Sequence, residues 1–384
     1  MKTILTTEEL AAFCKECATQ PYVTVDTEFL RERTYFSKLC LVQLAYPGEG
    51  DENAVIVDPL AAGIDLAPLY DLFRDENVVK VFHAARQDLE IFCVEGGVIP
   101  KPFFDTQVAA MVCGFGEQVG YETLVRKIVD AAVDKSSRFT DWSRRPLTDK
   151  QKTYALADVT HLRVIYEYLA EQLVKTDRTS WVEEEVAVLM DPATYTVIPE
   201  NAWKRLKTRT NSRKFLAVVR ELAAFREITA RGRNIPRNRI YKDDALMELA
   251  ATRPKSFDDL HKSRLLLREA RKGEIAEGIL AAVKKGEACE PEDMPEVPAQ
   301  RVKRNGSESL ADLLRVLLKA KAEKYSVAQK LIATSADLDA LANGDEVGAL
   351  RGWRKKVFGE DALRLKNGEI ALSASPHGVK IIEL

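Results

Sequence analysis

The chain has 384 residues, of which 46% are hydrophobic and 30% charged, a composition typical of a globular protein with two or three domains. It has no apolar run of about 18 residues, so we expect no contact with a membrane, and its N-terminus lacks the apolar core of a signal peptide. Six cysteines are scattered along the chain, and the one close pair, Cys14 and Cys17, lacks the further ligands of a zinc site. We therefore expect reduced thiols and a cytoplasmic protein.

The net charge of −2 conceals a difference between the two halves of the chain. Residues 1–200 hold 20 Lys and Arg against 33 Asp and Glu, whereas residues 201–290 hold 22 against 12. An acidic front half joined to a basic module predicts a charged partner that the basic module binds and presents to the acidic one.

Strand and helix patterns alternate along the first half of the chain. After a helix at 8–18, strand patterns at 22–29, 39–46, 53–58, 78–83 and 102–105 are interleaved with helix patterns at 66–73, 86–94, 106–112 and 148–175. Three strands in close succession, followed by alternating helices and strands, predict a mixed sheet flanked by helices.

The second half is predicted to be helical. Helical spacing recurs at 215–228, 243–251 and 257–283, and the acidic, proline-rich stretch 290–298 predicts an extended linker. A second helical block runs from 308 to 365, and the tail at 366–384 carries little signal.

The first strand pattern contains two acids, Asp26 and Glu28. Side chains two residues apart leave a strand on the same face, so the two carboxylates lie side by side. Such a pair repels unless a cation lies between them, and Mg²⁺ prefers carboxylate oxygens. The alternative is a pair of acids at an exposed strand end, bound to Arg31 or Arg33.

Two later segments offer further acids. Asp88 lies just inside a helix that follows a strand; it is either a ligand or a first-turn acid favoured by the helix dipole. Tyr154 and Asp158 are four residues apart on a predicted helix and therefore share a face, either as functional groups or as a buried hydrogen-bonded pair.

Together these acids match a known kind of chemistry. Four carboxylates can hold two metal ions about 4 Å apart, the arrangement used for in-line displacement at phosphorus. Tyr154 would orient the attacking water by hydrogen bonding, because a phenol with a pKa of about 10 is a poor base at neutral pH.

Asp26-Thr27-Glu28, Asp88 and Tyr154-x-x-x-Asp158 resemble the three motifs of the DEDD superfamily of 3′→5′ exonucleases, in its tyrosine subclass. The segments 41–44, 104–107 and 141–147 are similar to those of the ribonuclease D family. This resemblance covers nearly the whole chain and implies an α/β ribonuclease-H-like catalytic domain followed by two all-α HRDC domains. The domains implied are an exonuclease domain at 1–190, a first HRDC domain at 208–290, a linker at 291–306 and a second HRDC-like domain, with a less clear match, at 307–384.

The resemblance also implies two divalent metal ions, Mg²⁺ or Mn²⁺, with no small-molecule cofactor, and release of 5′-mononucleotides from RNA 3′ ends, including those of tRNA precursors. By the same resemblance Asp26 bridges both ions, Glu28 and Asp158 hold the ion that activates water, and Asp88 serves the other ion.

Several further residues are candidates for RNA contacts. Phe29, with Tyr35 and Phe36, is either a stacking platform for bases or ordinary packing, and His83 either contacts a phosphate or caps a strand end. The basic candidates are Arg144 and Arg145, just before the last motif, and Arg231 and Arg233, in a basic run between residues 204 and 239. For these arginines the alternatives are surface salt bridges and a solvated helix face.

Two other functions use the same residues. A proofreading-type DNA 3′→5′ exonuclease needs the same four acids and is disfavoured by the HRDC pair and the ribonuclease D resemblance. A non-catalytic nucleic-acid-binding scaffold is disfavoured because it has no need of four acids and a tyrosine in this arrangement.

Overall fold

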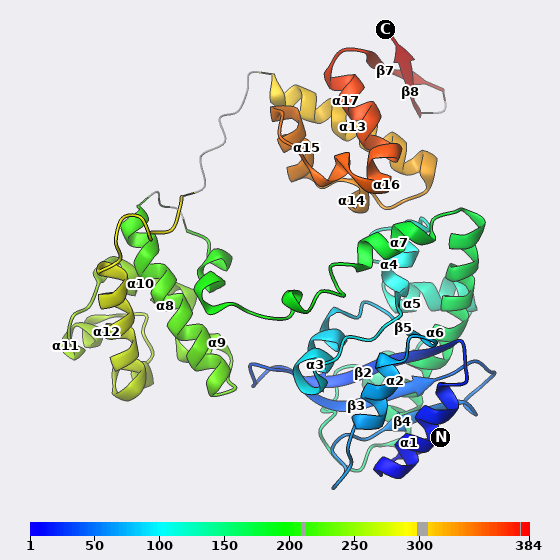
Figure 1. Cartoon of the computed structure of the whole chain (residues 1–384), viewed down its shortest axis with the longest axis horizontal. Coiled ribbons are helices and arrows are strands. Elements are labelled where there is room, and N and C mark those ends of the chain that lie inside the picture. The colour runs from blue at the N-terminus through cyan, green and yellow to red at the C-terminus, as the bar shows by residue number, and fades with distance from the viewer. Residues whose placement is uncertain (209, 211, 298–305, 377) are drawn as a thin grey trace.

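The computed structural model describes residues 1–208, 210, 212–297, 306–376 and 378–384. It consists of an N-terminal α/β domain followed by two helical domains (Figure 1). Within the described residues, no helix combines the length and apolar character needed to cross a bilayer.

The α/β domain is built on a six-stranded sheet. Its strands are β1 (Lys2–Ile4), β2 (Tyr22–Leu30), β3 (Lys38–Ala45), β4 (Ala54–Val57), β5 (Val79–Phe82) and β6 (Phe103–Asp105), in the order β1-β4-β3-β2-β5-β6. β3 is antiparallel to both of its neighbours, and the other pairs are parallel, so the sheet is mixed as predicted. β1 was not predicted, because three residues are too few to show a strand period.

Helices cover both faces of this sheet. On one face α1 (Thr7–Cys17), α2 (Ala67–Arg74) and α3 (Arg86–Gly96) enclose an apolar core that includes Cys14 and Cys17, and all six cysteines are free. On the other face lies α6 (Asp149–Lys175), whose start is fixed by a capping box between Thr148 and Gln151. The shorter helices α4 (Thr106–Val112), α5 (Tyr121–Leu124) and α7 (Thr179–Val186) pack against the later part of α6. Short 3₁₀ or π-helical turns lie at 125–129, 135–137, 192–194 and 199–205.

The first helical domain has one break that the sequence did not predict. Its helices are α8 (Arg213–Gly232), α9 (Arg237–Ile240), α10 (Asp243–Thr252), α11 (Phe257–Lys262) and α12 (Gly273–Glu287), with a 3₁₀ turn at 268–271. The predicted single helix at 257–283 is wrong, because the Glu248 carboxylate accepts the backbone N–H groups of Arg264 and Leu265 and thereby holds them outside a helix.

The first part of the predicted linker is docked on this domain. Arg213 and Arg220 of α8 donate to the carbonyl oxygens of Met294 and Asp293 at 2.8 and 2.7 Å, and Met294 is buried. An extended linker is therefore wrong for residues 291–297, and residues 298–305 lie outside the described part of the chain.

The second helical domain ends in a hairpin. Its helices are α13 (Ser307–Tyr325), α14 (Gln329–Ile332), α15 (Ser335–Asn343), α16 (Gly352–Arg354) and α17 (Glu360–Lys366), with a 3₁₀ turn at 348–350 and a π-helical turn at 355–359. The antiparallel strands β7 (Ile370–Ser375) and β8 (Gly378–Glu383) follow, where the sequence carried little signal.

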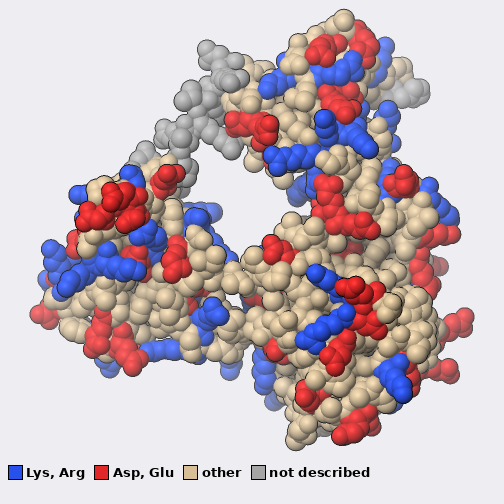
Figure 2. All heavy atoms as spheres, in the orientation of Figure 1, with Lys and Arg blue, Asp and Glu red and all other residues tan. Residues whose placement is uncertain are grey.

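The α/β domain contacts both helical domains. Trp353 stacks on Trp181 with ring centroids 4.4 Å apart, and the Arg354 guanidinium lies 3.0 Å from Glu184. Tyr35, in the β2–β3 connection, donates a hydrogen bond to Glu227 of α8. The space-filling view shows an open space between the three domains, with charges of both signs on the surface of each (Figure 2).

Candidate active site

Three acids converge on one face of the sheet. Asp26 and Glu28 leave β2 on the face that α6 covers, and α6 places Asp158 above them. One carboxylate oxygen from each of the three residues lies within 4.8 Å of the others. The β2–β3 pairing shifts register directly after Glu28, so the regular ladder is interrupted beside the acids.

The electrostatics of this cluster are those of crowded carboxylates. Burial, together with the charges of Asp26, Asp158 and Asp88, raises the pKa of Glu28 to about 10. Burial raises the pKa of Asp158 to about 7, although the Tyr154 hydroxyl and Arg138 lower it. Burial and the charge of Asp158 raise the pKa of Asp26 well above its ordinary range. A bound cation is the natural counterpart of such a cluster, because it favours the ionised form of every member.

Asp88 approaches the cluster from the other side of the sheet. It lies in the first turn of α3, and its buried carboxylate accepts a hydrogen bond from Thr27, the residue between Asp26 and Glu28. Burial and the charge of Asp26 raise the pKa of Asp88, so the two acids interact. Asp88 does not belong to the three acids that lie within 4.8 Å of one another.

The turn that carries Asp88 depends on an acid that the sequence did not single out as functional. Ala84, between β5 and α3, has a left-handed backbone with a φ of 57°, which costs an alanine about 1–2 kcal/mol. The carboxylate of Asp105 accepts the backbone N–H groups of Ala84 and Ala85, each at 3.0 Å, and also caps α4. Asp105 therefore fixes the path of the chain into α3; the sequence signal for it lay in the family-like segment 104–107.

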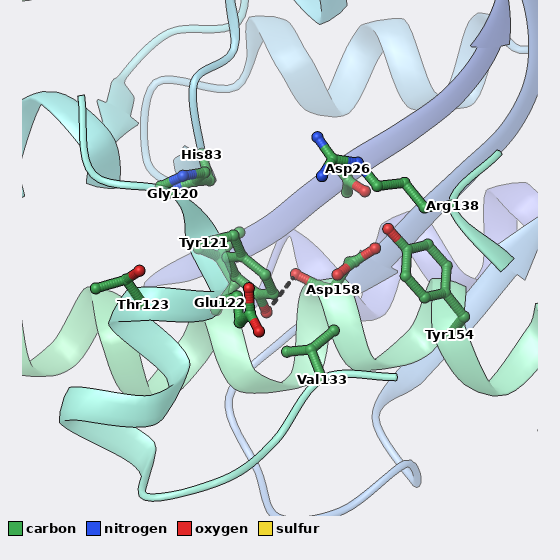
Figure 3. A pocket seen from close by; sticks show the side chains of 11 residues that line it. Asp26, His83, Gly120, Tyr121, Glu122, Thr123, Val133, Arg138, Tyr154 and Asp158 are labelled. Atoms are coloured by element: carbon green, nitrogen blue, oxygen red, sulfur yellow. Dashed lines mark hydrogen bonds between the residues drawn. The ribbon is translucent and has the colours of Figure 1, made fainter. Parts of the chain in front are cut away.

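Two tyrosines accompany Asp158. Tyr154 lies one helical turn before it and points toward Asp26 and Asp158 (Figure 3). Burial and the charges of Asp158, Glu28 and Asp26 raise the pKa of Tyr154, so its phenol stays protonated. Tyr121 of α5 donates to the carbonyl oxygens of Ala157 and Asp158, both at 2.9 Å, and thereby braces α6 at the position of the acid.

These groups line a cavity of about 270 Å³, which Arg138 and His83 also border (Figure 3). Arg138, from the loop that precedes α6, lowers the pKa of Glu28 and Asp158 by its charge. The sequence analysis missed Arg138, because nothing in its local pattern separates it from other loop arginines. The Nδ1 atom of His83 lies 3.0 Å from the Thr106 hydroxyl, and burial lowers the pKa of His83.

Of the arginines predicted to contact RNA, Arg145 has a structural role. Its guanidinium pairs with Asp58 and donates to the carbonyl oxygens of Cys40, Trp142 and Arg144. The geometry therefore argues against a phosphate contact for Arg145, because its guanidinium is already occupied by Asp58 and three carbonyl oxygens. Arg144 beside it is exposed and makes no ion pair within the described residues.

The other predicted RNA contacts lie outside the 270 Å³ cavity. Phe29 packs, half-buried, against the core beneath α1 to α3. Tyr35 takes part in the contact between domains, because its hydroxyl group donates a hydrogen bond to Glu227 and the Arg237 guanidinium lies 4.8 Å from its ring. In the first helical domain, Arg233 pairs with Glu274 at 2.7 Å and Arg231 is exposed.

Gln43 is a further polar residue beside the acids. It pairs with Asp26 across the β2–β3 ladder, so the two side chains leave the sheet on the same face. Gln43 is fully buried, and neither atom of its amide group has a hydrogen-bond partner in the described part of the protein. A buried amide without a partner is costly. Because its N–H groups are free and Asp26 is its neighbour on the same face, a small movement would let the Gln43 amide donate to the Asp26 carboxylate and orient it.

The cluster fits a hard divalent cation. Two oxygens bound to one Mg²⁺ ion lie at most about 4.2 Å apart, because each Mg–O distance is about 2.1 Å. The Asp26, Glu28 and Asp158 oxygens lie within 4.8 Å of one another, so only a small movement brings all three to one ion. An oxygen-only donor set favours Mg²⁺ or Mn²⁺ over softer metals.

Two bacterial relatives decide the family. A protein named ribonuclease D from Jannaschia sp. is 66% identical over 383 residues, which is 100% of this chain and 99% of the relative. A protein of the same name from Granulibacter bethesdensis is 50% identical, covering 99% of this chain and 96% of the relative. The chain belongs to the ribonuclease D family.

Structural and domain comparisons agree with this assignment. The crystal structure of Escherichia coli RNase D, an exoribonuclease involved in structured RNA processing, matches with a TM-score of 0.82 at 28% identity, covering 96% of this chain and 98% of that one. Residues 1–174 match the family model for a 3′-5′ exonuclease, and residues 215–283 match that of the HRDC domain. The predicted family is confirmed, and so is one HRDC domain.

Proposed function

We propose that this member of the ribonuclease D family is a 3′→5′ exoribonuclease that releases 5′-mononucleotides and uses Asp26, Glu28, Asp88, Tyr154 and Asp158 as its catalytic residues. The observation that carries the assignment of residues is the convergence of Asp26, Glu28 and Asp158 within 4.8 Å, with Asp88 tied to the same strand through Thr27.

Divalent metal ions, Mg²⁺ or Mn²⁺, would lower the pKa of the attacking water and stabilise the charge on the leaving 3′-oxygen. Asp26, Glu28 and Asp158 would hold one ion, and Asp26 and Asp88 the other. The Tyr154 phenol donates to the attacking water, a role for which its raised pKa suits it because the proton stays in place.

The substrate-facing groups that we assign are Arg138 and His83, which border the cavity beside the acids. Arg138 is placed to neutralise the scissile phosphate, and His83 to donate to a phosphate oxygen. Phe29, Arg144, Arg231 and Arg233 remain predicted contacts with more distant parts of the RNA. RNAs with free single-stranded 3′ ends, tRNA precursors among them, are the proposed substrates, and the six unpaired thiols support a cytoplasmic location.

We also propose that residues 307–384 form a second HRDC-like domain. Apart from α11, which has no counterpart, the order of its elements follows that of residues 208–290. A 19-residue helix, a 4-residue helix and a 9-residue helix (α13, α14 and α15) correspond to helices of 20, 4 and 10 residues (α8, α9 and α10). The helical run 352–366 then takes the place of α12.

Digestion of an RNA labelled at its 3′ end, compared with one labelled at its 5′ end, with and without a chelator, tests direction, product and metal requirement together. Asp26→Asn and Asp158→Asn should bind RNA normally and lose nearly all hydrolysis, whereas Asp71→Asn, an exposed acid paired with Arg74, should cleave like the original protein. Undiminished cleavage by both active-site variants would place the chemistry elsewhere.

Two comparisons of substrates refine the proposal. Faster cleavage of a 2′-deoxy strand than of a 2′-hydroxyl strand of the same length would favour the DNA exonuclease. A tRNA precursor with a single-stranded 3′ extension should be shortened faster than one whose 3′ end is base-paired.

A further inference from the structure

A second cavity, of about 730 Å³, lies between the α/β domain and the first helical domain. Arg31 and Arg86 border it from the α/β domain, and Arg205, Arg231 and Arg237 border it from the other side. Figure 1 shows the β2–β3 connection reaching from the α/β domain toward α8 and α9, which brings these residues together. Glu90 is the only acid in the described lining.

Two of the five arginines are neutralised by carboxylates. Arg31 makes a two-pronged contact with Glu90, at 2.9 and 3.1 Å, and Arg237 pairs with the buried Glu227. The other three, Arg86, Arg205 and Arg231, are exposed, and no carboxylate lies within 4.0 Å of them in the parts of the chain that the structure describes. Three guanidinium groups that face one hollow from two domains repel one another unless an anion enters.

This cavity adjoins the active site. Arg86 and Asp88 both lie in the first turn of α3, and residues two apart on a helix point to different sides. Asp88 faces the acids, while Arg86 faces the cavity, so the two sites are separated by about the 10–12 Å width of one helix. Arg31 likewise follows directly on β2, the strand that carries Asp26 and Glu28.

We propose that this cavity is a second RNA-binding site, which holds backbone phosphates upstream of the 3′-terminal nucleotide while that nucleotide lies at the acids. The inference rests on the proposed exoribonuclease function. Arginine is suited to the task because its planar fork contacts phosphate oxygens in pairs. An acidic protein partner fits the charge as well, but the position of the cavity beside the active site favours the strand that is being degraded.

The test compares the variant Arg86→Ala/Arg205→Ala/Arg231→Ala with the original protein on a dinucleotide and on a long single-stranded RNA with the same 3′ end. A dinucleotide is too short to span both sites, so its kcat and KM should not change. For the long RNA we expect KM to rise about tenfold or more, with kcat little altered. The slope of log affinity against log salt should fall by about 0.7 for each phosphate that the variant no longer neutralises.

Two control variants make the result specific. Lys255→Ala/Arg268→Ala/Lys272→Ala removes the same charge from exposed positions of the first helical domain that lie outside the cavity lining, and should change KM much less. The corresponding triple lysine variant of the cavity should recover most of the salt dependence, because lysine also neutralises phosphate. If the lysine variant recovers the salt dependence, and if the alanine variant keeps the melting temperature of the original protein, then misfolding does not explain the higher KM of the alanine variant.

Equal increases in KM for the cavity variant and the surface control would overturn the proposal, since binding would then depend only on the charge of the domain. An unchanged KM for long RNA, combined with weakened binding of a polyglutamate probe, would assign the cavity to an acidic protein instead. Failure of the original protein to shorten the long RNA would count against the exoribonuclease function itself and is therefore distinguishable.

Discussion

At the proposed metal site, we expect Glu28 and Asp158 to couple metal binding to pH. Their folded-state pKa values, about 10 and about 7, exceed the ordinary values of 4.5 and 3.8, so the metal-free folded protein binds more protons than the unfolded chain. Its free energy of unfolding should therefore fall as the pH rises from about 4 to 7 through Asp158, and continue to fall toward pH 10 through Glu28. A cation binds the ionised forms, so the stabilisation it provides should grow with pH.

Melting temperatures measured with Mg²⁺ and with a chelator, at a series of pH values between about 5 and 8, check this expectation. The difference between the two curves should widen with pH in the original protein and stay flat in Asp26→Asn/Asp158→Asn. A difference that narrows with rising pH would contradict the metal site.

Gln43 offers a second prediction at the residue scale. Gln43→Met keeps the volume and removes a buried amide without a partner, so the metal-free protein should be as stable as before or more stable, by up to about 3 kcal/mol. Metal affinity should nevertheless fall, because Asp26 loses a neighbour that can orient it. Leu41→Met, at the position opposite Glu28, is the matched control and should leave metal affinity unchanged in a calorimetric titration.

At the scale of elements, the turn between β5 and α3 depends on Asp105. Asp105→Ala removes two hydrogen bonds to this turn and the cap of α4, so we expect a loss of about 3 kcal/mol in the free energy of unfolding. The rate of hydrolysis should fall by more than the loss of folded protein accounts for, because His83 and Asp88 lie on either side of the turn that Asp105 holds. Thr334→Ala, which removes the cap of α15, should cost about 1 kcal/mol in chemical denaturation and leave hydrolysis intact.

The same elements show which parts of the fold could be predicted from the sequence. β2 and α6 were predicted because each is long and has a clear period, and the candidate site residues Asp26, Glu28, Tyr154 and Asp158 were identified on them. The break between α11 and α12 was missed, because a side chain distant in sequence, Glu248, binds the intervening backbone.

The supporting residues of the site were harder to predict. Tyr121 and Arg138 lie in short or irregular segments, and only the folded chain brings them to Asp158. Conversely, Arg145 looked like an RNA contact until the fold placed Asp58 beside it. Local patterns predict the strand or helix on which a residue lies, whereas its partner across the fold depends on tertiary packing.

On the scale of the whole molecule, polar, aromatic and apolar contacts attach the second helical domain to the α/β domain. The Ala328 N–H donates to the Met111 carbonyl oxygen at 3.0 Å, Lys330 pairs with Glu117, and Leu331 packs against the core beside α4 and α7.

Arg354 pairs with Glu184 and Glu185, and Trp353 donates to Glu185 at 3.0 Å. Arg354→Glu places three carboxylates together and should release this domain from α7. Small-angle scattering should then show a larger radius of gyration, whereas Arg351→Glu, an exposed neighbour, should leave it unchanged. Unaltered dimensions in Arg354→Glu would mean that the remaining contacts, among them the Lys330–Glu117 ion pair and the Ala328–Met111 hydrogen bond, hold the domain without Arg354.

The strand that carries Asp26 and Glu28 leads directly into a loop that contacts the first helical domain. In this loop the backbone N–H groups of Tyr35 and Phe36 donate to the Asn234 side chain, at 3.1 and 3.0 Å. Anyone who shortens this enzyme to its first 190 residues therefore frees one end of the segment that anchors the reaction centre. A minimal nuclease made from this chain would need a redesigned loop there, with a turn that holds itself in place without the helical domain.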